Sequence, residues 1–186
     1  MAKRDEWKEA QSRMNPSQLV FLDESGVNTD MTRRYARAYQ GTRAHGNAPL
    51  NKPVSTTILS SIRADGSTVP VILSGALNRE KFKEYLRESL LPTLKPGDIV
   101  IADNLRAHKG DGISELIASV GATMIYLPPY SPDLNPIEQM WSKIKAYLRM
   151  VQARSVDALL KAIPMAFATI AQEDAIGWFS YDGYSC

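Results

Sequence analysis

Three acidic side chains stand where carboxylate chemistry would be useful. Asp23 and Asp103 each come directly after a short apolar run, and Glu138 enters a helix candidate 11 residues after a third run. A carboxylate just past a buried strand is costly to desolvate unless it pairs with a positive group or binds a cation. Because an open sheet brings strand ends together, acids far apart in sequence can meet there. Their hard oxygen atoms suit Mg²⁺ or Mn²⁺, so the sequence predicts a metal-binding trio.

The third acid lies in a proline-rich segment. Residues 127–138 read Leu-Pro-Pro-Tyr-Ser-Pro-Asp-Leu-Asn-Pro-Ile-Glu, and the prolines restrict φ and remove backbone donors. Asn135 is typical of a helix N-cap, Pro136 of the first helical position, and Glu138 then falls at N3. An Asn cap with Glu at N3 also resembles a capping box, which stabilises a helix without any catalysis. The two other acids favour the metal-binding interpretation of Glu138.

A mixed sheet with helices on its faces would hold these acids. Residues 24–53 show no clear periodicity and form a long excursion, and a loop of that length usually serves a function. The order of strand, hairpin, helix, strand, helix, strand and helix gives an α/β fold with a mixed five-stranded sheet flanked by helices. The apolar runs and turn signals predict strands at 18–23, 54–62, 68–73, 98–102 and 123–127, and helices at 3–14, 78–91, 112–120 and from 135 onward.

We expect one catalytic domain with a helical segment at each end. The N-terminal helical extension covers residues 1–17 and the catalytic domain covers residues 18–152. Residues 153–186 form a C-terminal helical segment that packs on the same domain. Within it, Val156 to Ala171 is a helix candidate that Pro164 interrupts or kinks.

Charge is informative through its distribution rather than its total. The net charge of +2 is too small to indicate a nucleic-acid-binding protein. Basic residues gather in the excursion, with Tyr35 and Tyr39 among them, and they could neutralise phosphates while the tyrosines stack on bases. The alternative is a solvated charged loop. The residues predicted to contact DNA are Arg33, Arg34, Arg37, Arg43 and Lys52 in the excursion, and Lys145 in the helix after Asn135.

Cysteine usage and hydropathy bear on the cellular compartment. Cys186 is the only cysteine, so an intrachain disulfide is impossible and a reducing compartment fits. No stretch approaches 18 apolar residues, and the opening residues lack the apolar core of a signal peptide. We therefore expect a cytoplasmic protein without a membrane partner.

Three sequence blocks together resemble a known family. They are Val20-Phe21-Leu22-Asp23-Glu24-Ser25, then Ile101-Ala102-Asp103-Asn104 with His108, and the proline-rich segment 127–138. They resemble the DDE transposases of the mariner-related superfamily, in particular the bacterial insertion sequence 630 family. Between Asp103 and Glu138 lie 34 residues, a spacing typical of that family. The resemblance runs from about Leu19 to Tyr184, and the proline-rich block is its most specific part.

The resemblance implies an RNase H-like fold, in agreement with the order of elements. It implies cleavage at transposon ends, followed by attack of the freed 3′-hydroxyl on target DNA, usually at a TA dinucleotide, by a homodimer on DNA. Two metal ions would serve this reaction. By similarity, Asp23 is the bridging ligand, with Asp103 on one ion and Glu138 on the other.

The residues around the trio receive lesser roles. Asn104 and His108 are expected to orient the ligands or the DNA, although His108 could equally cap the next helix. Glu24 should point to the face opposite Asp23 if the strand continues, so it is a weaker ligand candidate. The remaining acids near the blocks, read mainly as turn formers, stay outside the predicted site: Asp98, Asp111 and Asp133.

One expected part is missing from this sequence. Family members usually carry an N-terminal helix-turn-helix region that recognises the transposon ends, and the residues before the first strand are too few to hold one. We expect a separately encoded region or a truncated copy. Two alternatives to an active transposase stay open: a catalytically silent DNA-binding remnant, and an RNase H-like nuclease acting on RNA–DNA hybrids or branched DNA.

Overall fold

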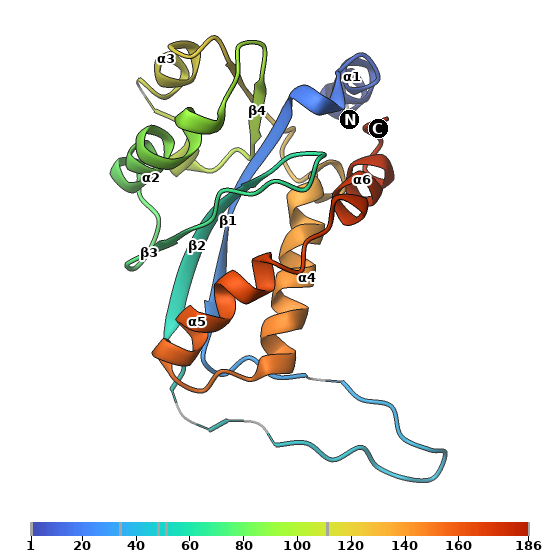
Figure 1. The fold of residues 1–186 in the computed structure, drawn as a ribbon. Helices are drawn as coiled ribbons and strands as arrows, with labels where there is room; N and C mark the ends of the chain where they lie inside the picture. Colours follow the sequence, from blue (N-terminus) through green and yellow to red (C-terminus); the bar gives the residue numbers. More distant parts are fainter. Residues whose placement is uncertain (1, 34, 48, 51, 111, 186) are drawn as a thin grey trace.

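A five-stranded mixed sheet forms the centre of the protein, in the order β3-β2-β1-β4-β5 (Figure 1). The computed structural model describes residues 2–33, 35–47, 49–50, 52–110 and 112–185. The central strand β1 pairs antiparallel with β2 and parallel with β4, which in turn pairs parallel with β5. The strands are β1 (Leu19–Asn28), β2 (Ser55–Ile62), β3 (Val71–Leu73), β4 (Ile99–Ala102) and β5 (Thr123–Tyr126).

Helices cover both faces of the sheet, as predicted. On one face lie α2 and α3; on the other lie α4, α5 and α6, while α1 packs beside the C-terminal end of the chain (Figure 1). The helices are α1 (Ala2–Gln11), α2 (Arg79–Tyr85), α3 (Ile113–Ala118), α4 (Pro136–Val151), α5 (Val156–Phe167) and α6 (Gln172–Tyr181), and α2 continues as a π-helical turn, Leu86–Leu90. None of the helices in these described ranges is long and apolar enough to cross a membrane.

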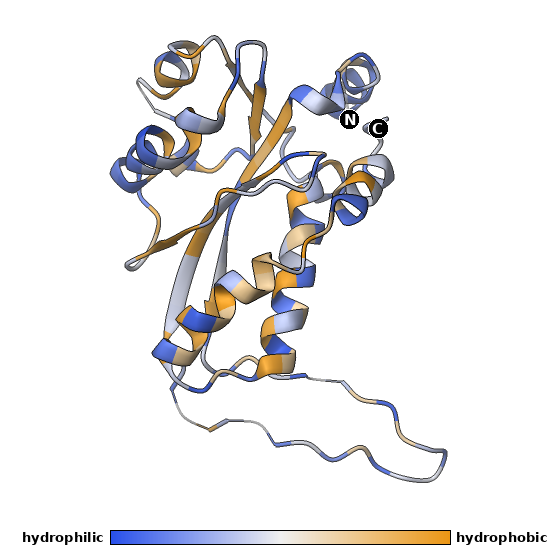
Figure 2. Cartoon of the chain, in the orientation of Figure 1, coloured by the Kyte–Doolittle hydropathy of each residue, from blue (hydrophilic) through white to orange (hydrophobic). Residues whose placement is uncertain are grey.

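The first strand is buried from both sides. Leu19 to Leu22 have no exposed surface, which explains their continuous apolar run. Val20 and Leu22 face the α2–α3 side, and Leu19 and Phe21 face the α4 side. Figure 2 shows the hydrophobic residues concentrated along β1 and β4 and on the inner sides of the helices. The sheet can therefore hold polar side chains rigidly just beyond this apolar run.

Two predicted strands differ from the observed ones. β1 was predicted to end at residue 23 but continues to Asn28, because residues 24–28 pair with β2 after β4 has ended. Cross-strand pairing thus outweighs the weak strand preference of Ser, Gly and Asn. The strand predicted at 68–73 is shorter, since only Val71–Leu73 pair continuously with β2. Pro70, which lacks an amide donor, precedes them.

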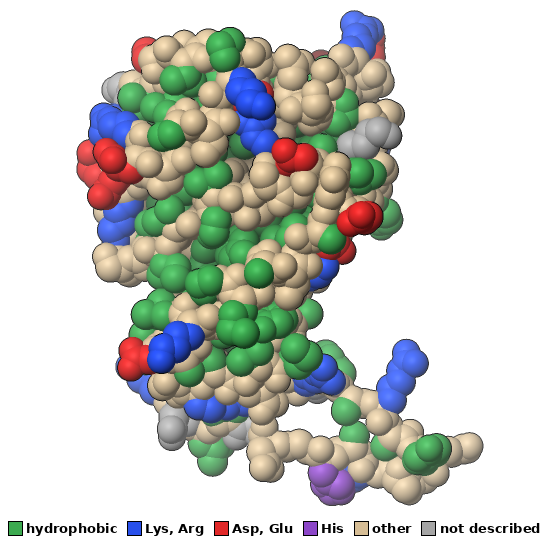
Figure 3. Space-filling model, viewed as in Figure 1, with side chains coloured by type: hydrophobic (Ala, Val, Ile, Leu, Met, Phe, Trp, Pro, Cys, Tyr) green, Lys and Arg blue, Asp and Glu red, His purple; other side chains and the backbone are tan. Residues whose placement is uncertain are grey.

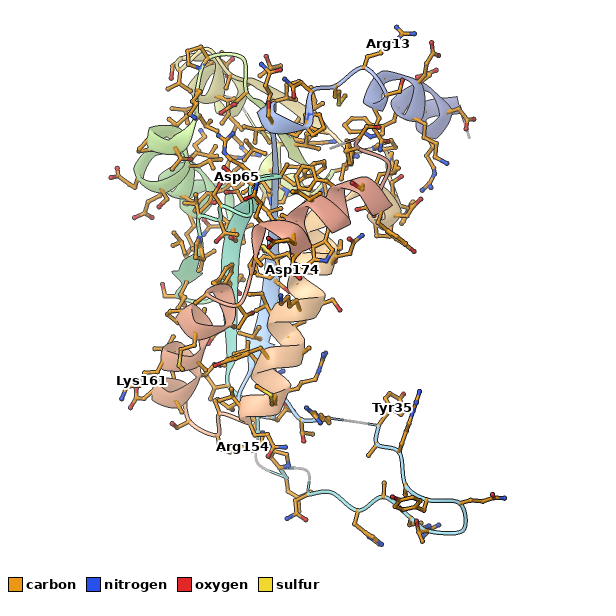
Figure 4. All side chains as sticks on the ribbon, turned by 45° about the vertical axis from the view of Figure 1, so that its right-hand side comes forward. Arg13, Tyr35, Asp65, Arg154, Lys161 and Asp174 are labelled. Atoms are coloured by element: carbon orange, nitrogen blue, oxygen red, sulfur yellow. The ribbon has the colours of Figure 1, made fainter. Side chains whose placement is uncertain are left out.

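The excursion between β1 and β2 leaves the body of the protein as an extended arm (Figures 1 and 3). Its described residues form no helix or strand, and most are exposed. Arg154 fastens its base by donating to the carbonyl oxygen of Met31 at 2.9 Å. Figure 4 shows Arg154 at this base and Tyr35 further out along the arm.

The C-terminal helices belong to the core on the α4 side. α5 runs through Pro164 without the predicted interruption. The ring of Phe179 in α6 lies edge-on to Phe21, with centroids 5.3 Å apart, and the Tyr184 ring lies 5.0 Å from Phe21. The end of the chain therefore packs directly against the strand that carries Asp23.

We expect Phe179→Ala to lower the free energy of unfolding by about 3–5 kcal/mol, because it removes a fully buried ring next to Phe21. Tyr181→Ala, at an 84% exposed position of the same helix, is the matched control and should cost less than about 0.5 kcal/mol. Urea unfolding measures both. Equal, small effects would show that the C-terminal helices do not share the core of the sheet.

Candidate metal-binding active site

Asp23 and Asp103 lie at the same level of the sheet. The parallel pairing of β1 and β4 ends at Leu22 and Ala102, and each acid is the next residue. Alternation along β1 places Asp23 on the face of Phe21, which α4 covers. The Asp23 residue is only 9% exposed. The register of two parallel strands thus brings together acids that are 80 positions apart in sequence.

Glu138 is at N3 of α4, as predicted. Asn135 is the N-cap residue and Pro136 begins the helix. The Asn135 side chain makes no capping hydrogen bond, and its buried Oδ1 lacks a partner among the described residues. The capping box that would explain Glu138 structurally is therefore not formed, and the exposed Glu138 side chain is available for another role.

A cleft of about 500 Å³ brings two of the acids together. Asp103 and Glu138 both line it, along with Asn104. Its other described lining residues, which do not include Asp23, come mainly from the proline-rich segment: Leu105, Leu127, Pro128, Pro129, Tyr130, Ser131, Pro132 and Asn135.

The charge state of Asp23 links it to this cleft. Burial raises the pKa of Asp23, and the negative charges of Glu24, Glu138 and Asp103 raise it further, to about 8, against one backbone hydrogen bond that lowers it. Asp23 is therefore largely protonated at neutral pH unless a positive charge arrives. A divalent cation would supply that charge.

A buried histidine holds Asp103. His108 has no exposed surface; its Nδ1 lies 2.7 Å from Asp103 Oδ1 and its Nε2 lies 3.0 Å from Glu24 Oε2. Burial lowers the pKa of His108, but the hydrogen bond with Asp103 and the contact with the Glu24 carboxylate outweigh it and raise the pKa to about 9. The imidazolium thus ties the end of β4 to β1. Phe82 packs on its ring at 4.7 Å between centroids.

The contact with His108 also affects the ionisation of Asp103. Burial would raise the pKa of Asp103, but the hydrogen bonds from His108 and from the Leu105 amide outweigh it and hold the pKa below its usual value. Asp103 therefore stays a carboxylate at neutral pH, with one oxygen engaged by the protein. The sequence left open whether His108 orients the site or caps a helix, and the contacts with two carboxylates favour the first.

Asn104 and Glu24 have supporting positions. The Asn104 amide donates to the carbonyl oxygen of Leu127 and accepts from Lys109 Nζ, so it fastens Asp103 to the proline-rich segment. Alternation along β1 places Glu24 on the face opposite Asp23, and its contact with His108 was not predicted. No local signal could have indicated it, because the strand was predicted to end at Asp23 and the contact joins residues 84 positions apart in sequence.

The predicted DNA contacts lie outside the cleft. Arg33, Arg37, Arg43 and Lys52 are exposed along the arm, and Lys145 is half-buried on α4. Arg34 lies outside the described residues. The structure does not bring these side chains to the acids, and their contact with DNA stays a prediction.

The carboxylate oxygens of the three acids are chemically suited to a divalent cation, although the side chains do not converge on one point. In the described ranges, no three His, Cys, Asp or Glu side chains converge closely enough to hold a metal ion. Like charges repel, and one Asp103 oxygen turns toward His108. Among the same residues, neither Asp23 nor Glu138 forms an ion pair with a basic side chain. Hard carboxylate oxygens next to a buried acid are a donor set for Mg²⁺ or Mn²⁺.

Comparisons with known proteins agree with this fold. A family model described as DDE superfamily endonuclease matches residues 18–160. The Transposable element Tcb1 transposase of Caenorhabditis briggsae is 26% identical, over 71% of this chain and 50% of that protein. A Mos1 transposase paired-end complex with left transposon end matches with a TM-score of 0.79 and 16% identity, over 96% of this chain and 56% of that chain.

The catalytic domain of Mos1 mariner transposase matches with a TM-score of 0.66 and 13% identity, over 96% of this chain and 84% of that chain. Mos1 paired-end complexes with Mn and with Mg match as well. The predicted RNase H-like fold is thereby confirmed. The chain spans about half the length of the Tcb1 transposase and of the Mos1 chain in the complex with the left transposon end.

The raised pKa of Asp23 predicts how stability depends on pH without metal. Between its ordinary value of 3.8 and about 8, native Asp23 keeps a proton that the unfolded chain has lost. The free energy of unfolding should therefore fall as pH rises through this window, by about 2–5 kcal/mol. Asp23→Asn should weaken this dependence and leave the part above about pH 6.5 that the raised pKa of His108 contributes. Glu115→Gln, an exposed control on α3, should preserve the native dependence.

Urea unfolding between pH 5 and pH 8 measures this effect. At pH 8, adding Mn²⁺ should restore the stability of the native protein, but not that of the Asp23→Asn variant. A flat profile for the native protein, or the same Mn²⁺ response in both proteins, would contradict the role given to Asp23.

Proposed function

Since this chain belongs to the DDE superfamily of endonucleases, we propose that it carries the active site of a metal-dependent transposase. The observation that carries the proposal is the junction of β1, β4 and α4, where Asp23, Asp103 and Glu138 come from three elements toward one end of the sheet. The proposed reaction is cleavage of a DNA phosphodiester at transposon ends, followed by transfer of the freed 3′-hydroxyl to target DNA.

Asp23, Asp103 and Glu138 are the residues that would hold Mg²⁺ or Mn²⁺. Mos1 complexes solved with Mn and with Mg support the use of a divalent cation. Bound there as a pair, such ions would activate the attacking oxygen and stabilise the leaving oxygen of an in-line displacement. We assign the bridging position to Asp23 by resemblance.

The chain's own residues prepare this reaction in three ways. His108 keeps Asp103 ionised and aimed from the end of β4. The first turn of α4 presents Glu138 at the positive end of a helix, where an anionic phosphate is also favoured. The cleft volume lies within the range of ligand sites, so a phosphodiester can reach the two acids that line it.

DNA is the proposed partner, supported by the transposon-end and strand-transfer complexes of Mos1. The arm and α4 supply basic residues for phosphates outside the cleft: Arg33, Arg37, Arg43, Lys52 and Lys145, with Arg34 in the same run of sequence. By resemblance we also propose a TA target, a homodimer on DNA and a separately encoded helix-turn-helix region. The single cysteine supports a cytoplasmic site of action.

The test is strand cleavage of a supercoiled plasmid carrying the two DNA segments that flank the gene, with Mn²⁺ or Mg²⁺. Asp103→Asn should lower the cleavage rate by more than about 100-fold, because it removes a proposed metal ligand. Glu115→Gln, exposed on α3, should leave the rate unchanged. A helix-turn-helix region is added in a parallel reaction.

Three results would contradict the proposal. A loss of less than tenfold on Asp103→Asn would exclude a ligand role. DNA binding without Mn²⁺ binding at the acids would identify a silent remnant. Faster cleavage of RNA–DNA hybrids than of the flanking duplexes would identify an RNase H-like nuclease.

A further inference from the structure

The helix α1 lies outside the segment that matches the DDE family, yet one of its faces reaches the proline-rich segment. Arg4, Trp7 and Gln11 are three and four positions apart, so they share that face. Arg4 contacts three groups in the turn Tyr130–Asp133. Its Nη1 donates to the Tyr130 carbonyl oxygen and to Ser131 Oγ, both at 3.0 Å, and its Nη2 donates to Asp133 Oδ2 at 2.6 Å.

The other two residues attach α1 to the end of the chain, which also supports this segment. Trp7 Nε1 donates to Tyr184 Oη at 3.2 Å, and that hydroxyl donates to the Leu134 carbonyl oxygen at 2.8 Å. Gln11 Nε2 donates to the Asp182 carbonyl oxygen at 2.6 Å. We call Arg4, Trp7 and Gln11 the α1 clasp.

The described backbone hydrogen bonds of the turn lie at its C-terminal end, where the amides of Leu134 and Asn135 donate to the carbonyl oxygens of Ser131 and Pro132. The part around Tyr130 therefore gains most from support outside the turn. Three prolines between residues 127 and 133 contribute no amide donor. Tyr130 has a φ of 56°, an uncommon value for a residue other than glycine, and its side chain is 98% exposed. Core packing of the Tyr130 side chain therefore cannot hold this conformation, whereas the bond from Arg4 to its carbonyl oxygen can.

The turn held by Arg4 is also a wall of the cleft. Tyr130 and Ser131 line it together with Asp103 and Glu138, and only five positions separate Asp133 from Glu138. A shift of the turn would move the start of α4 and therefore the third acid. Small misplacements of catalytic groups cost large factors in rate, so a residue that fixes the turn matters to the reaction.

From these contacts we propose that Arg4 is a positioning residue, which fixes the Tyr130–Asp133 turn and thereby places Glu138 at the cleft. Its catalytic consequence rests on the proposed function. A guanidinium is suited to the task because its planar fork can engage several acceptors at once, whereas a lysine ammonium cannot reproduce that geometry. Because Arg4 and Asp133 lie at the surface, the contacts should affect the local geometry of the turn more than global stability.

The turn that directly follows α1 offers a matched control. Arg13 pairs with Glu9 at 2.7 Å, and both side chains are about three-quarters exposed. Figure 4 shows Arg13 pointing away from the body of the protein. Arg13→Ala therefore removes the same side chain from the same part of the chain without touching the proline-rich segment.

Hydrogen exchange followed by mass spectrometry tests the positioning itself, without metal or DNA. The informative amides are those of Leu127, Leu134, Asn135 and Glu138, which donate to backbone carbonyl oxygens. Arg4→Ala should speed exchange of peptides covering 127–140 by about fivefold or more, while peptides from β1 and β4 stay unchanged. Arg13→Ala should match the native protein. Equal exchange in the two variants would overturn the proposal.

Plasmid cleavage with Mn²⁺ tests the consequence for the reaction. Arg4→Ala should lower kcat by about tenfold and leave KM for DNA within about twofold, and Arg4→Lys should lie between Arg4→Ala and the native protein. The double variant Arg4→Asp with Asp133→Arg should recover part of the kcat that Arg4→Asp alone loses. A general destabilisation would not allow this recovery. Unchanged kcat in Arg4→Ala would overturn the positioning role. If the native protein does not cleave, the proposed function fails and Arg4 loses its catalytic role, while the exchange result still decides whether it fixes the turn.

Discussion

Repulsion among carboxylates at one end of the sheet is the constraint on which the rest of this structure depends. Asp23, Glu24, Asp103 and Glu138 all contribute to the electrostatics of this end, and burial makes the ionised form of Asp23 costly. The protein relieves part of the repulsion with one buried cation of its own, His108, which contacts two of the four. The remaining negative charge is what a divalent cation would neutralise.

The fold supplies rigid supports for this unfavourable arrangement. The apolar run of β1 is buried on both faces, so Asp23 comes directly after a segment of its own strand that cannot easily move. The pairing of β4 with β1 ends at Ala102 and Leu22, so Asp103 lies at the level of Asp23. The third acid comes from a helix whose start is preceded by a proline-rich turn, and that turn is held by contacts from both ends of the chain. The arm, by contrast, extends away from these supports (Figure 3).

Local signals in the sequence were sufficient for the parts of the site that depend on local structure. Apolar runs located β4 and β5, and the Asn135–Pro136 pair located the start of α4, because caps and first-turn prolines act within a few residues. The length of β1 was not predictable in this way, since residues 24–28 form a strand only by pairing with β2. The contact of Glu24 with His108 and that of Arg4 with the proline-rich turn join residues 84 and more than 120 positions apart in sequence. Only the tertiary fold brings such pairs together.

Whether the three acids bind metal together can be decided by anomalous diffraction from crystals of this chain soaked in Mn²⁺. We expect manganese peaks within about 2.5 Å of carboxylate oxygens of Asp23, Asp103 and Glu138, with Asp23 shared where two ions bind. Manganese bound elsewhere, or absent from these three acids while the crystal takes up the ion, would contradict it.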